Sequence, residues 1–436
     1  MSKTKLLLVA VLFAVGSLPV LAQDGFDAAV EQGVTPMNQL GQEDLAGGTG
    51  ESWPALSQSQ FLRDTTLNAQ LRSFYFNRDK SNGVRNEAWA LGGSVLFKSG
   101  YVADRFAIGA VAYTSQPLYA PHGDGGTGIL QADQDGYSVL GQLYLEAKLA
   151  DHLVVDIGRK GYNTPYLNMH DVRMTPNTFE GVSVLGSSDP GSATQWRYGA
   201  GFISKIKDWT SQNFEWMSRA AGASVDRGVA VAGANVKRQD FSLGAVEYYS
   251  NDIINIGYGE ATWRLPIAPG HALQLAGQYS DQRSTGSDLL KGYAFSTHQT
   301  GVRAELEAGA ALLALAYTNT ANGADMQSPW SGYPGYTSAQ VQNFNQAGES
   351  AIMLRAGYDF SRHGLAGLSA YVLGVHGSGA ASGSEDEGDL NLQWTPPSGP
   401  MRGTAFRLRY AHVDRHGGNP DTNDLRLIFN YDFPRP

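Results

Sequence analysis

Hydrophobic and polar side chains alternate along almost the whole chain with a period of two residues. In the segment 137–149, for example, Tyr137, Val139 and Leu143 share one side, while the other side is mostly polar. The segment 271–282 repeats this pattern. Because successive side chains of a β-strand point to opposite faces, the pattern predicts strands that are apolar on one face and polar on the other.

About 18 such segments follow one another, with an average length of about 10 residues, which is the length that a tilted membrane-spanning strand requires. Helical periodicity is scarce. The predicted strands begin near residues 65, 88, 105, 136, 152, 179, 195, 229, 241, 253, 271, 297, 311, 350, 365, 389, 402 and 424.

Short and long connections between these segments alternate with few exceptions. The short ones include 150–151, 237–240, 308–310 and 361–363, and the long ones are 116–135, 160–178, 208–228, 282–296, 321–349 and 375–388. Aromatic residues such as Trp263, Tyr317 and Tyr410 lie near strand ends. Tight turns at one rim, long loops at the other and aromatic girdles are typical of an antiparallel transmembrane β-barrel, which we expect over residues 65–436. A soluble sandwich, propeller or β-helix is the alternative.

Two glutamates do not fit this pattern. Glu247 and Glu260 fall on the apolar faces of the strands predicted near 241 and 253. Either a β-bulge shifts the phase of these strands, or their boundaries differ from those predicted.

The first 22 residues have the features of a secretory signal peptide: Lys3 and Lys5, an apolar stretch over 6–18, and a small-residue cleavage site that ends at Ala22. Residues 23–64 would then form an N-terminal periplasmic segment. The chain has no cysteine, which excludes disulfides and zinc–thiolate sites. Its net charge of −9 argues against nucleic-acid binding.

Three segments resemble the OprD family of Gram-negative outer-membrane porins. They are 61–79 (FLRDTTLNAQLRSFYFNRD), 163–181 (NTPYLNMHDVRMTPNTFEG) and 335–349 (GYTSAQVQNFNQAGE). The resemblance implies an 18-stranded barrel in the outer membrane, in contact with lipid and lipopolysaccharide, as a monomer or loose trimer. It also implies that the third and seventh long loops fold inward to a constriction, and that a "basic ladder" on the barrel wall leads carboxylates to it.

Arg407 and Arg409 match this ladder best, because Phe406, Leu408 and Tyr410 occupy the opposite face. A cation that faces lipid at mid-depth costs about 2–4 kcal/mol, so both arginines are expected to face the lumen. The same alternation places three more arginines inward, namely Arg355, Arg426 and Arg303. Arginine binds carboxylates bidentately. The alternative is that these arginines pair with acids such as Glu305, Asp359 and Asp432.

The third loop is long and contains two prolines, which suits an ordered insert. Asp171 and Arg173 could line the constriction or pair with each other, and Arg159 could extend the basic track or reach the rim. By resemblance, the seventh loop supplies hydroxyl groups of Tyr333, Tyr336 and Ser338 to the solute; the alternative is an exposed surface loop.

No catalytic, cofactor or metal site is expected. The G-x-G-x-x-G match at 123–128 has no βαβ context. The acidic stretches 133–136 and 385–389 could bind calcium weakly, but neither has the full twelve-residue ligand pattern, so they are predicted to be solvated loops. We therefore expect passive, selective diffusion of small anionic solutes that carry carboxylates, such as amino acids, aromatic or sugar acids and small peptides. The alternatives are a general non-selective porin, a structural or adhesin barrel without an open pore, and a barrel-embedded hydrolase.

Overall fold

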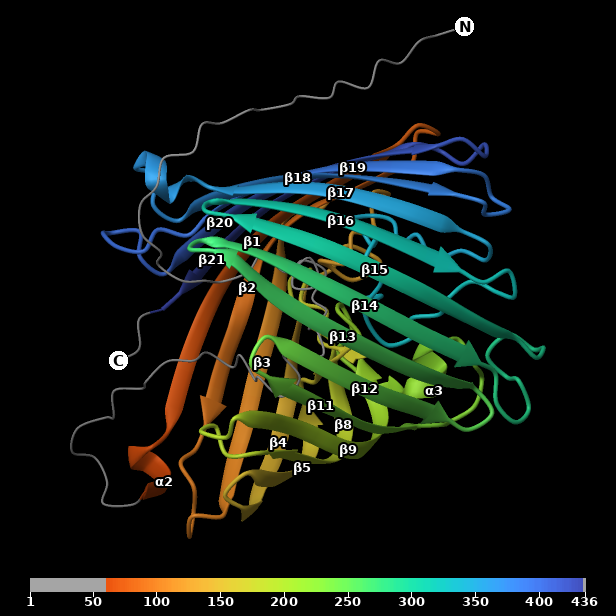
Figure 1. Ribbon diagram of the computed structural model, residues 1–436. Helices are drawn as coiled ribbons and strands as arrows, with labels where there is room; N and C mark the ends of the chain where they lie inside the picture. Colours follow the sequence, from red (N-terminus) through yellow and green to blue (C-terminus); the bar gives the residue numbers. More distant parts are fainter. Residues whose placement is uncertain (1–59, 434–436) are drawn as a thin grey trace, which may run out of the picture.

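A computed structural model describes residues 60–433, and in it 18 long antiparallel strands form a closed barrel (Figure 1). Each strand pairs with its neighbours in the chain, and β1 also pairs with β21, which closes the ring. The strands are β1 (Thr66–Lys80), β2 (Arg85–Lys98), β3 (Phe106–Tyr119), β4 (Tyr137–Ala150), β5 (Leu153–Lys160), β8 (Thr178–Ser187), β9 (Thr194–Lys207), β11 (Val229–Arg238), β12 (Phe241–Ser250), β13 (Ile254–Ala268), β14 (His271–Arg283), β15 (Ser296–Ala308), β16 (Ala311–Thr320), β17 (Ser350–Asp359), β18 (Leu368–Ser378), β19 (Glu385–Trp394), β20 (Thr404–Arg415) and β21 (Thr422–Asp432). The predicted all-β barrel of 18 strands is confirmed.

The remaining elements are short. They are α2 (Gln60–Arg63), α3 (Met217–Ala220), the 3-10 turn η2 (Phe360–His363) and the two-residue strands β6 (Asn163–Thr164), β7 (Leu167–Asn168) and β10 (Glu215–Trp216). Over residues 60–433, no helix has the length and apolar character needed to cross a membrane. The predicted signal peptide, 1–22, and all of the predicted segment 23–64 except residues 60–64 lie outside the described residues.

One connection and one acidic stretch differ from the prediction. The connection predicted over 375–388 spans only 379–384, and the acidic stretch 385–389 belongs to β19 rather than to a solvated loop. Glu385, Glu387 and Asp389 alternate along this strand and are buried on its inner face. The outer positions between these acids are Asp386 and Gly388, so this end of the strand has no apolar face, and this is why the prediction was wrong.

The long connections lie at the rim toward the right of Figure 1, where α3 also lies, and they span 120–136, 161–177, 208–228, 284–295 and 321–349. We call 161–177 loop 3 and 321–349 loop 7. On the outer face of the barrel, large apolar side chains such as Leu313, Leu315 and Val302 are half exposed, as expected for a lipid-facing surface.

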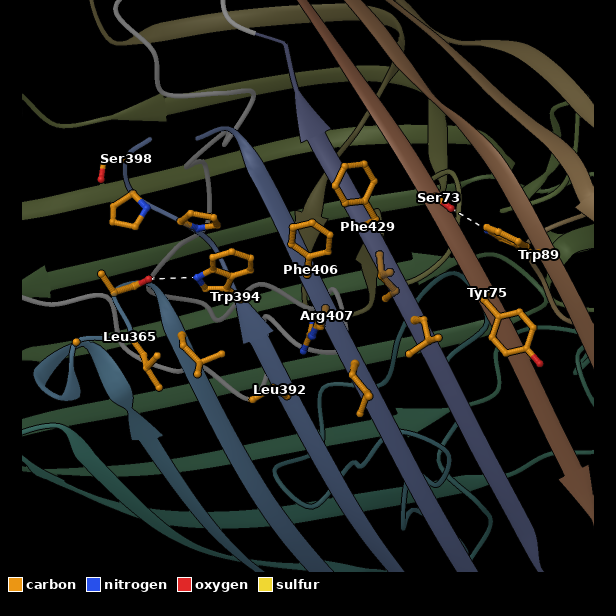
Figure 2. A pocket seen from close by; sticks show the side chains of 18 residues that line it. Ser73, Tyr75, Trp89, Leu365, Leu392, Trp394, Ser398, Phe406, Arg407 and Phe429 are labelled. Atoms are coloured by element: carbon orange, nitrogen blue, oxygen red, sulfur yellow. Dashed lines mark hydrogen bonds between the residues drawn. The ribbon is translucent and has the colours of Figure 1, made fainter. Parts of the chain in front are cut away.

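A hollow of about 1050 Å³ also lies on this outer face. Trp394, Phe406 and Phe429 project into it from β19, β20 and β21, and the first two rings stack 5.6 Å apart (Figure 2). The hollow therefore belongs to the lipid-facing band and lies apart from the enclosed polar residues described below.

Part of the barrel interior holds a buried apolar core. Loop 3, loop 7, α3 and the inner faces of β11–β13 contribute most of its members. We call this group the apolar cluster, and it comprises Tyr166, Leu167, Phe179, Ile203, Ile206, Met217, Ala223, Val229, Val246, Tyr248, Ile253, Ile254, Ile256, Tyr258, Phe295, Ala324, Met326, Trp330 and Tyr333.

The apolar cluster explains one of the two glutamates that did not fit, namely Glu260. The pairing of β12 with β13 runs from Phe241↔Trp263 to Ser250↔Ile254 without a register shift, so no bulge changes the phase. Glu247 is exposed on the outer face, whereas Glu260 is buried on the inner face. Ile256 shares the inner face with Glu260 because the apolar cluster covers it.

Candidate functional site

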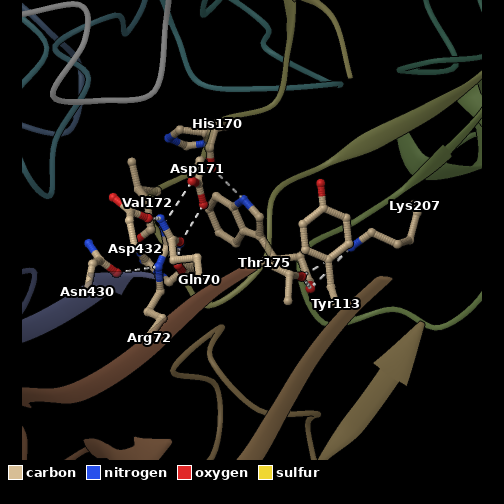
Figure 3. A network of polar contacts seen from close by, with 12 residues as sticks. Gln70, Arg72, Tyr113, His170, Asp171, Val172, Thr175, Lys207, Asn430 and Asp432 are labelled. Carbon is tan, nitrogen blue, oxygen red and sulfur yellow. Dashed lines mark hydrogen bonds and ion pairs between the residues drawn. The ribbon is translucent and has the colours of Figure 1, made fainter. Parts of the chain in front are cut away.

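Loop 3 is tied to strand β1 by an arginine–carboxylate pair (Figure 3). The Nη1 of Arg72 donates to Asp171 Oδ1 at 2.6 Å, and its Nη2 donates to Asp171 Oδ2 at 3.0 Å. The Nε of Arg72 donates to Asn430 on β21. Such a bidentate contact fixes geometry as well as adding energy, so Arg72 holds the Asp171 end of loop 3 against the β21–β1 wall.

The other end of loop 3 packs against distant strands. Tyr166 is fully buried, and its backbone N–H donates to the hydroxyl of Tyr248 on β12 at 3.1 Å. The Tyr166 hydroxyl lies 2.8 Å from that of Ser280 on β14. The Tyr166 ring also meets Tyr333 of loop 7 edge-on, at 6.0 Å. Loop 3 therefore links β1 to β12 and β14, which lie far from β1 around the ring.

A cavity of about 670 Å³ lies between loop 3 and the inner faces of β4 to β12. Tyr162 and Met169 of loop 3 line one side, and Gln142, Glu146 and Arg197 line the wall. Apolar side chains line the cavity together with the guanidinium group of Arg197 and the carboxylate of Glu146, so its surface is amphipathic.

Loop 7 is anchored at its first half by aromatic residues. The indole N–H of Trp330 donates to the carbonyl of Met217 in α3 at 2.9 Å. The Tyr336 hydroxyl donates to Glu260 at 2.7 Å, and the guanidinium of Arg303 lies 4.6 Å from the centre of the Tyr336 ring. These contacts bind loop 7 to the β13–β15 wall.

The tip of loop 7, which we define as Gln340, Val341 and Gln342, is bound to β19. Three successive backbone N–H groups donate to carboxylates there. The N–H of Gln340 donates to Asp389 at 3.0 Å, and those of Val341 and Gln342 donate to the two oxygens of Glu387, each at 2.7 Å. The acids on the inner face of β19 thus hold the loop 7 tip.

Beside this tip, several guanidinium groups surround one buried carboxylate. Asp424 on β21 is fully buried and lies 2.6 Å from Arg78 Nη2 and 2.7 Å from Arg426 Nε. Arg409 on β20 is the direct cross-strand partner of Arg426. Together with Arg173 of loop 3, these residues form what we call the arginine cluster: Arg78, Arg173, Arg409 and Arg426 around Asp424.

The ring of Phe76 holds three of these cations together. The guanidinium groups of Arg78, Arg173 and Arg426 lie 5.4, 5.3 and 5.5 Å from its centre. Arg173 also lies 4.8 Å from the Trp209 ring. Cation–π attraction favours this grouping of like charges, which would otherwise repel one another.

Two loop residues have strongly shifted pKa values. Burial, and then the charge of Arg173, lowers the pKa of His170 to about 3, so this imidazole is neutral beside the arginine cluster. Burial raises the pKa of Glu349, at the end of loop 7, to about 7, and the neighbouring charges of Glu385 and Asp325 act in the same direction.

The predicted ladder residues occupy two places on the inner wall. Arg409 and Arg426 lie in the arginine cluster, and Arg407 on the same strand donates to Asn391. Arg303 and Arg355 are buried elsewhere, with Arg303 beside Glu305 at 3.7 Å and Arg355 against the Tyr371 ring at 4.2 Å. Arg303 therefore lies beside a carboxylate and Arg355 against an aromatic ring, and neither belongs to the arginine cluster.

Among the predicted loop residues, Asp171 pairs with Arg72 rather than with Arg173. Tyr333 lies within the apolar cluster, and Ser338 donates to the carbonyl of Asn343 at 3.4 Å.

Arg159 lies on the outer face, so of the two places predicted for it, an inner basic track and the rim, the inner track was wrong. It pairs with Glu180 at 3.0 Å, and its register partner Leu143 is an exposed outer residue. The next residue, Lys160, is buried on the inner face, where it contacts Asp156 at 2.8 Å.

Sequence reasoning missed five residues of the site. Arg72 and Arg78 lie on the inner face of β1, where the buried Phe74 and Phe76 also point inward, so alternation along 72–78 could have indicated both arginines. Asp424 could have been found in the same way, since it is two residues from Arg426. The roles of Glu387 and Asp389 depend on how loop 7 returns to the wall, for which the sequence carries no local signal.

The arrangement suits the binding of anions rather than bond chemistry. Four guanidinium groups lie around Asp424, and the charges of two of them, Arg409 and Arg426, also act on Asp389, so cations outnumber these two carboxylates. Planar guanidinium groups recognise carboxylates bidentately. In the part of the chain from 60 to 433, no group of three or more His, Asp or Glu residues is arranged to hold a metal ion.

Comparison with known proteins agrees with this architecture. Porin D of Pseudomonas aeruginosa is 22% identical over 411 residues, which cover 85% of this chain and 91% of that protein. The porin-like protein GalP of Pseudomonas putida is 25% identical over 400 residues, with 85% and 92% covered. The crystal structure of Pseudomonas aeruginosa OccK9 (OpdG) matches with a TM-score of 0.77 at 22% identity over 86% of this chain and all of that one.

The structure of Pseudomonas aeruginosa OpdK with vanillate matches with a TM-score of 0.75 at 23% identity, over 86% of this chain and 99% of that one. The family model for OprD, described as an outer membrane porin, matches residues 59–435. This match covers most of the chain and establishes a channel of the bacterial outer membrane rather than an enzyme. The chain belongs to the OprD family of outer membrane porins.

Proposed function

We propose that this porin allows small carboxylate-bearing solutes to diffuse passively and selectively across the outer membrane. In this proposal the solute passes between loop 3 and loop 7, and its carboxylate is exchanged among the guanidinium groups of the arginine cluster. Each contact must be modest, because a single tight site would slow the exit of the solute, whereas several weak sites in series conduct well.

The observation that carries this proposal is the excess of positive charge around Asp424. Arg78 and Arg426 both contact this one carboxylate, and Arg409 and Arg173 add further guanidinium groups beside it. Arg173 comes from loop 3 and Gln340 from loop 7, so both loops reach the same place on the wall. This supports a constriction at the arginine cluster.

Two further observations favour a carboxylate as the solute group. Vanillate, with which the similar protein OpdK was solved, is a carboxylate. The amphipathic cavity beside loop 3 would also accommodate the apolar part of a small organic acid.

Planar-bilayer recording of the refolded protein tests the proposal. We expect small discrete openings, anion preference and a concentration-dependent block by carboxylates such as benzoate. Arg409→Ala should weaken the block at least tenfold, whereas Arg238→Ala, which removes the same charge from an exposed residue at a strand end, should not. Large openings without selectivity would indicate a general porin, and a folded protein without openings would indicate a structural or adhesin barrel.

A further inference from the structure

The loop 7 tip contacts the arginine cluster directly. The backbone carbonyl of Gln340 accepts a hydrogen bond from Arg426 Nη2 at 3.1 Å, and the Gln340 side-chain amide donates to Asp424 Oδ1 at 2.8 Å. One residue of loop 7 therefore binds both the cation and the anion at the centre of the cluster. A carbonyl oxygen on a guanidinium occupies a position that a carboxylate oxygen could take.

Two different walls hold the tip. The N–H groups of Gln340, Val341 and Gln342 donate to Asp389 and Glu387 on β19, whereas the carbonyl and the side chain of Gln340 reach across to Arg426 and Asp424 on β21. The Gln340 carbonyl and the Val341 N–H belong to one planar peptide unit, so they move together. When this peptide turns away from the arginine cluster, the N–H groups of Gln340 and Gln342 on either side of it can stay on β19.

We propose, on the basis of the proposed function, that Gln340 determines specificity as an internal competitor for the arginine cluster. A solute carboxylate takes the place of the Gln340 carbonyl on Arg426, and the peptide between Gln340 and Val341 turns aside while the N–H groups of Gln340 and Gln342 keep the loop attached to Asp389 and Glu387. A carboxylate carries a full negative charge and can bind a guanidinium group through two hydrogen bonds, whereas a carbonyl oxygen does neither, so the carboxylate compensates for the lost contacts. A neutral solute does not, and so it leaves Gln340 in place.

The first test removes the side chain that helps to hold the competitor. In Gln340→Ala the bond to Asp424 is lost, so carboxylates should block the ion current at 3- to 10-fold lower concentration than in the wild type. A purely structural role predicts the opposite, because a loosened loop would disorder the site and weaken the block. The matched control is Gln327→Ala, a loop 7 glutamine whose amide donates to the carbonyl of Asp325, and its half-blocking concentration should stay within twofold.

The second test fixes the tip in place. Because the chain has no cysteine, the pair Gln340→Cys and Asp389→Cys can be oxidised without competing thiols. Their native contact joins the Gln340 N–H to the Asp389 carboxylate at 3.0 Å, and a short bifunctional thiol reagent covers any remaining gap. Cross-linking should reduce carboxylate block at least tenfold while small-ion openings persist, and cleavage of the link should restore it. The two single-cysteine variants control for loss of the native side chains.

The outcomes distinguish the two proposals. If the wild type shows no carboxylate block, the proposed function fails. If the wild type is blocked but neither Gln340→Ala nor the cross-link changes the half-blocking concentration, the competitor role of Gln340 is overturned and the carboxylate channel stands.

Discussion

Arg409 and Arg426 are direct cross-strand partners on β20 and β21, so two guanidinium groups project side by side from the same inner wall. Like charges in directly opposite positions destabilise a sheet. Asp424 offsets this repulsion, because it is fully buried and lies within 2.7 Å of Arg426 and 2.6 Å of Arg78. Asp389 on β19 adds a second negative charge near both arginines, so the stability of this wall depends on its buried carboxylates, with Asp424 in direct contact.

Replacing Asp424 by a neutral residue should lower the free energy of unfolding of the barrel. Asp424→Asn leaves buried cations without their counter-charge, and breaking a buried pair in this way typically costs about 3–5 kcal/mol. Denaturant unfolding in detergent measures this loss. The control Asp432→Asn, at the exposed end of the same strand, should stay within about 0.5 kcal/mol of the wild type. Adding Arg409→Gln to Asp424→Asn should recover part of the loss, and a strictly additive double variant would contradict the repulsion argument.

Loop 3 should become mobile without its anchor on β1. Asp171→Ala removes both hydrogen bonds to Arg72, and bonds to charged groups contribute about 1.5–3 kcal/mol each when buried, with less expected at this partly exposed carboxylate. We expect increased current noise and faster proteolysis within 161–177. Asp64→Ala, which breaks the exposed contact with Arg63 at 3.1 Å, should change neither measurement.

The ring of Phe76 should be required for the arrangement of the arginine cluster. Phe76→Leu retains an apolar side chain but removes the ring face from three cations, and each cation–π contact is worth at least about 0.5–1 kcal/mol. We expect a loss of about 1.5–3 kcal/mol in unfolding free energy together with weaker carboxylate block. Phe74→Leu is the matched control, because Phe74 is equally buried on the same face of β1. Its effect on block should be small, and equal effects of the two variants would argue against a role for the cations.

Loop 7 should be less stable at high pH because of Glu349. Its folded-state pKa is raised to about 7, so the neutral form suits the folded protein. The stabilisation is complete below the ordinary pKa of about 4.5 and is lost as the pH rises through 7. Asp325, Glu385 and the Arg415 beside Glu385 are the charged groups around it.

Glu349→Gln removes this titration. The variant should therefore have a higher melting temperature than the wild type at pH 8 and nearly the same one at pH 4.5. Melting curves of both proteins at the two pH values measure the effect, and a wild type whose advantage grows with pH would reverse the sign of the argument.

A cation on the outer face should destabilise the barrel in proportion to its depth. Leu354 on β17 is 58% exposed and alternates with the inward-facing Arg355. Leu354→Arg should cost about 2–4 kcal/mol if this position faces the bilayer centre. Leu365→Arg, in the turn after η2, is the control and should cost less than about 1 kcal/mol. Unfolding in lipid vesicles compares them.

Most of the fold could be predicted from alternation alone. The first residues of β1 to β21 in the ring lie within four positions of those predicted, and the largest difference is at β19. Alternation reports the contrast between lipid-facing and lumen-facing residues, so it fails where an inner face is apolar, as at Ile256, or where an outer position is polar, as at Asp386.

The candidate site was predictable only in part. Arg409 and Arg426 followed from the side on which they fall. Arg159 was considered for the basic track because it lies at the entrance to loop 3. The alternation along β5 instead assigns the inner position to Lys160. Contacts such as Arg72 with Asp171, which are 99 residues apart, depend on how a loop crosses to a distant strand, and local sequence carries no information on this.

The apolar cluster divides the ring of strands into two arcs with different constraints. Along β11–β13 the inner positions follow the rules of a soluble protein's core, so Ile256→Ala should cost about 2–5 kcal/mol, as a large-to-small change in a packed interior does. Along β19–β21 and β1 the inner positions carry charge, and changes there alter which solutes bind. Recognition can therefore diverge on one arc while the other keeps the barrel intact, which fits a family whose members share a fold at low sequence identity.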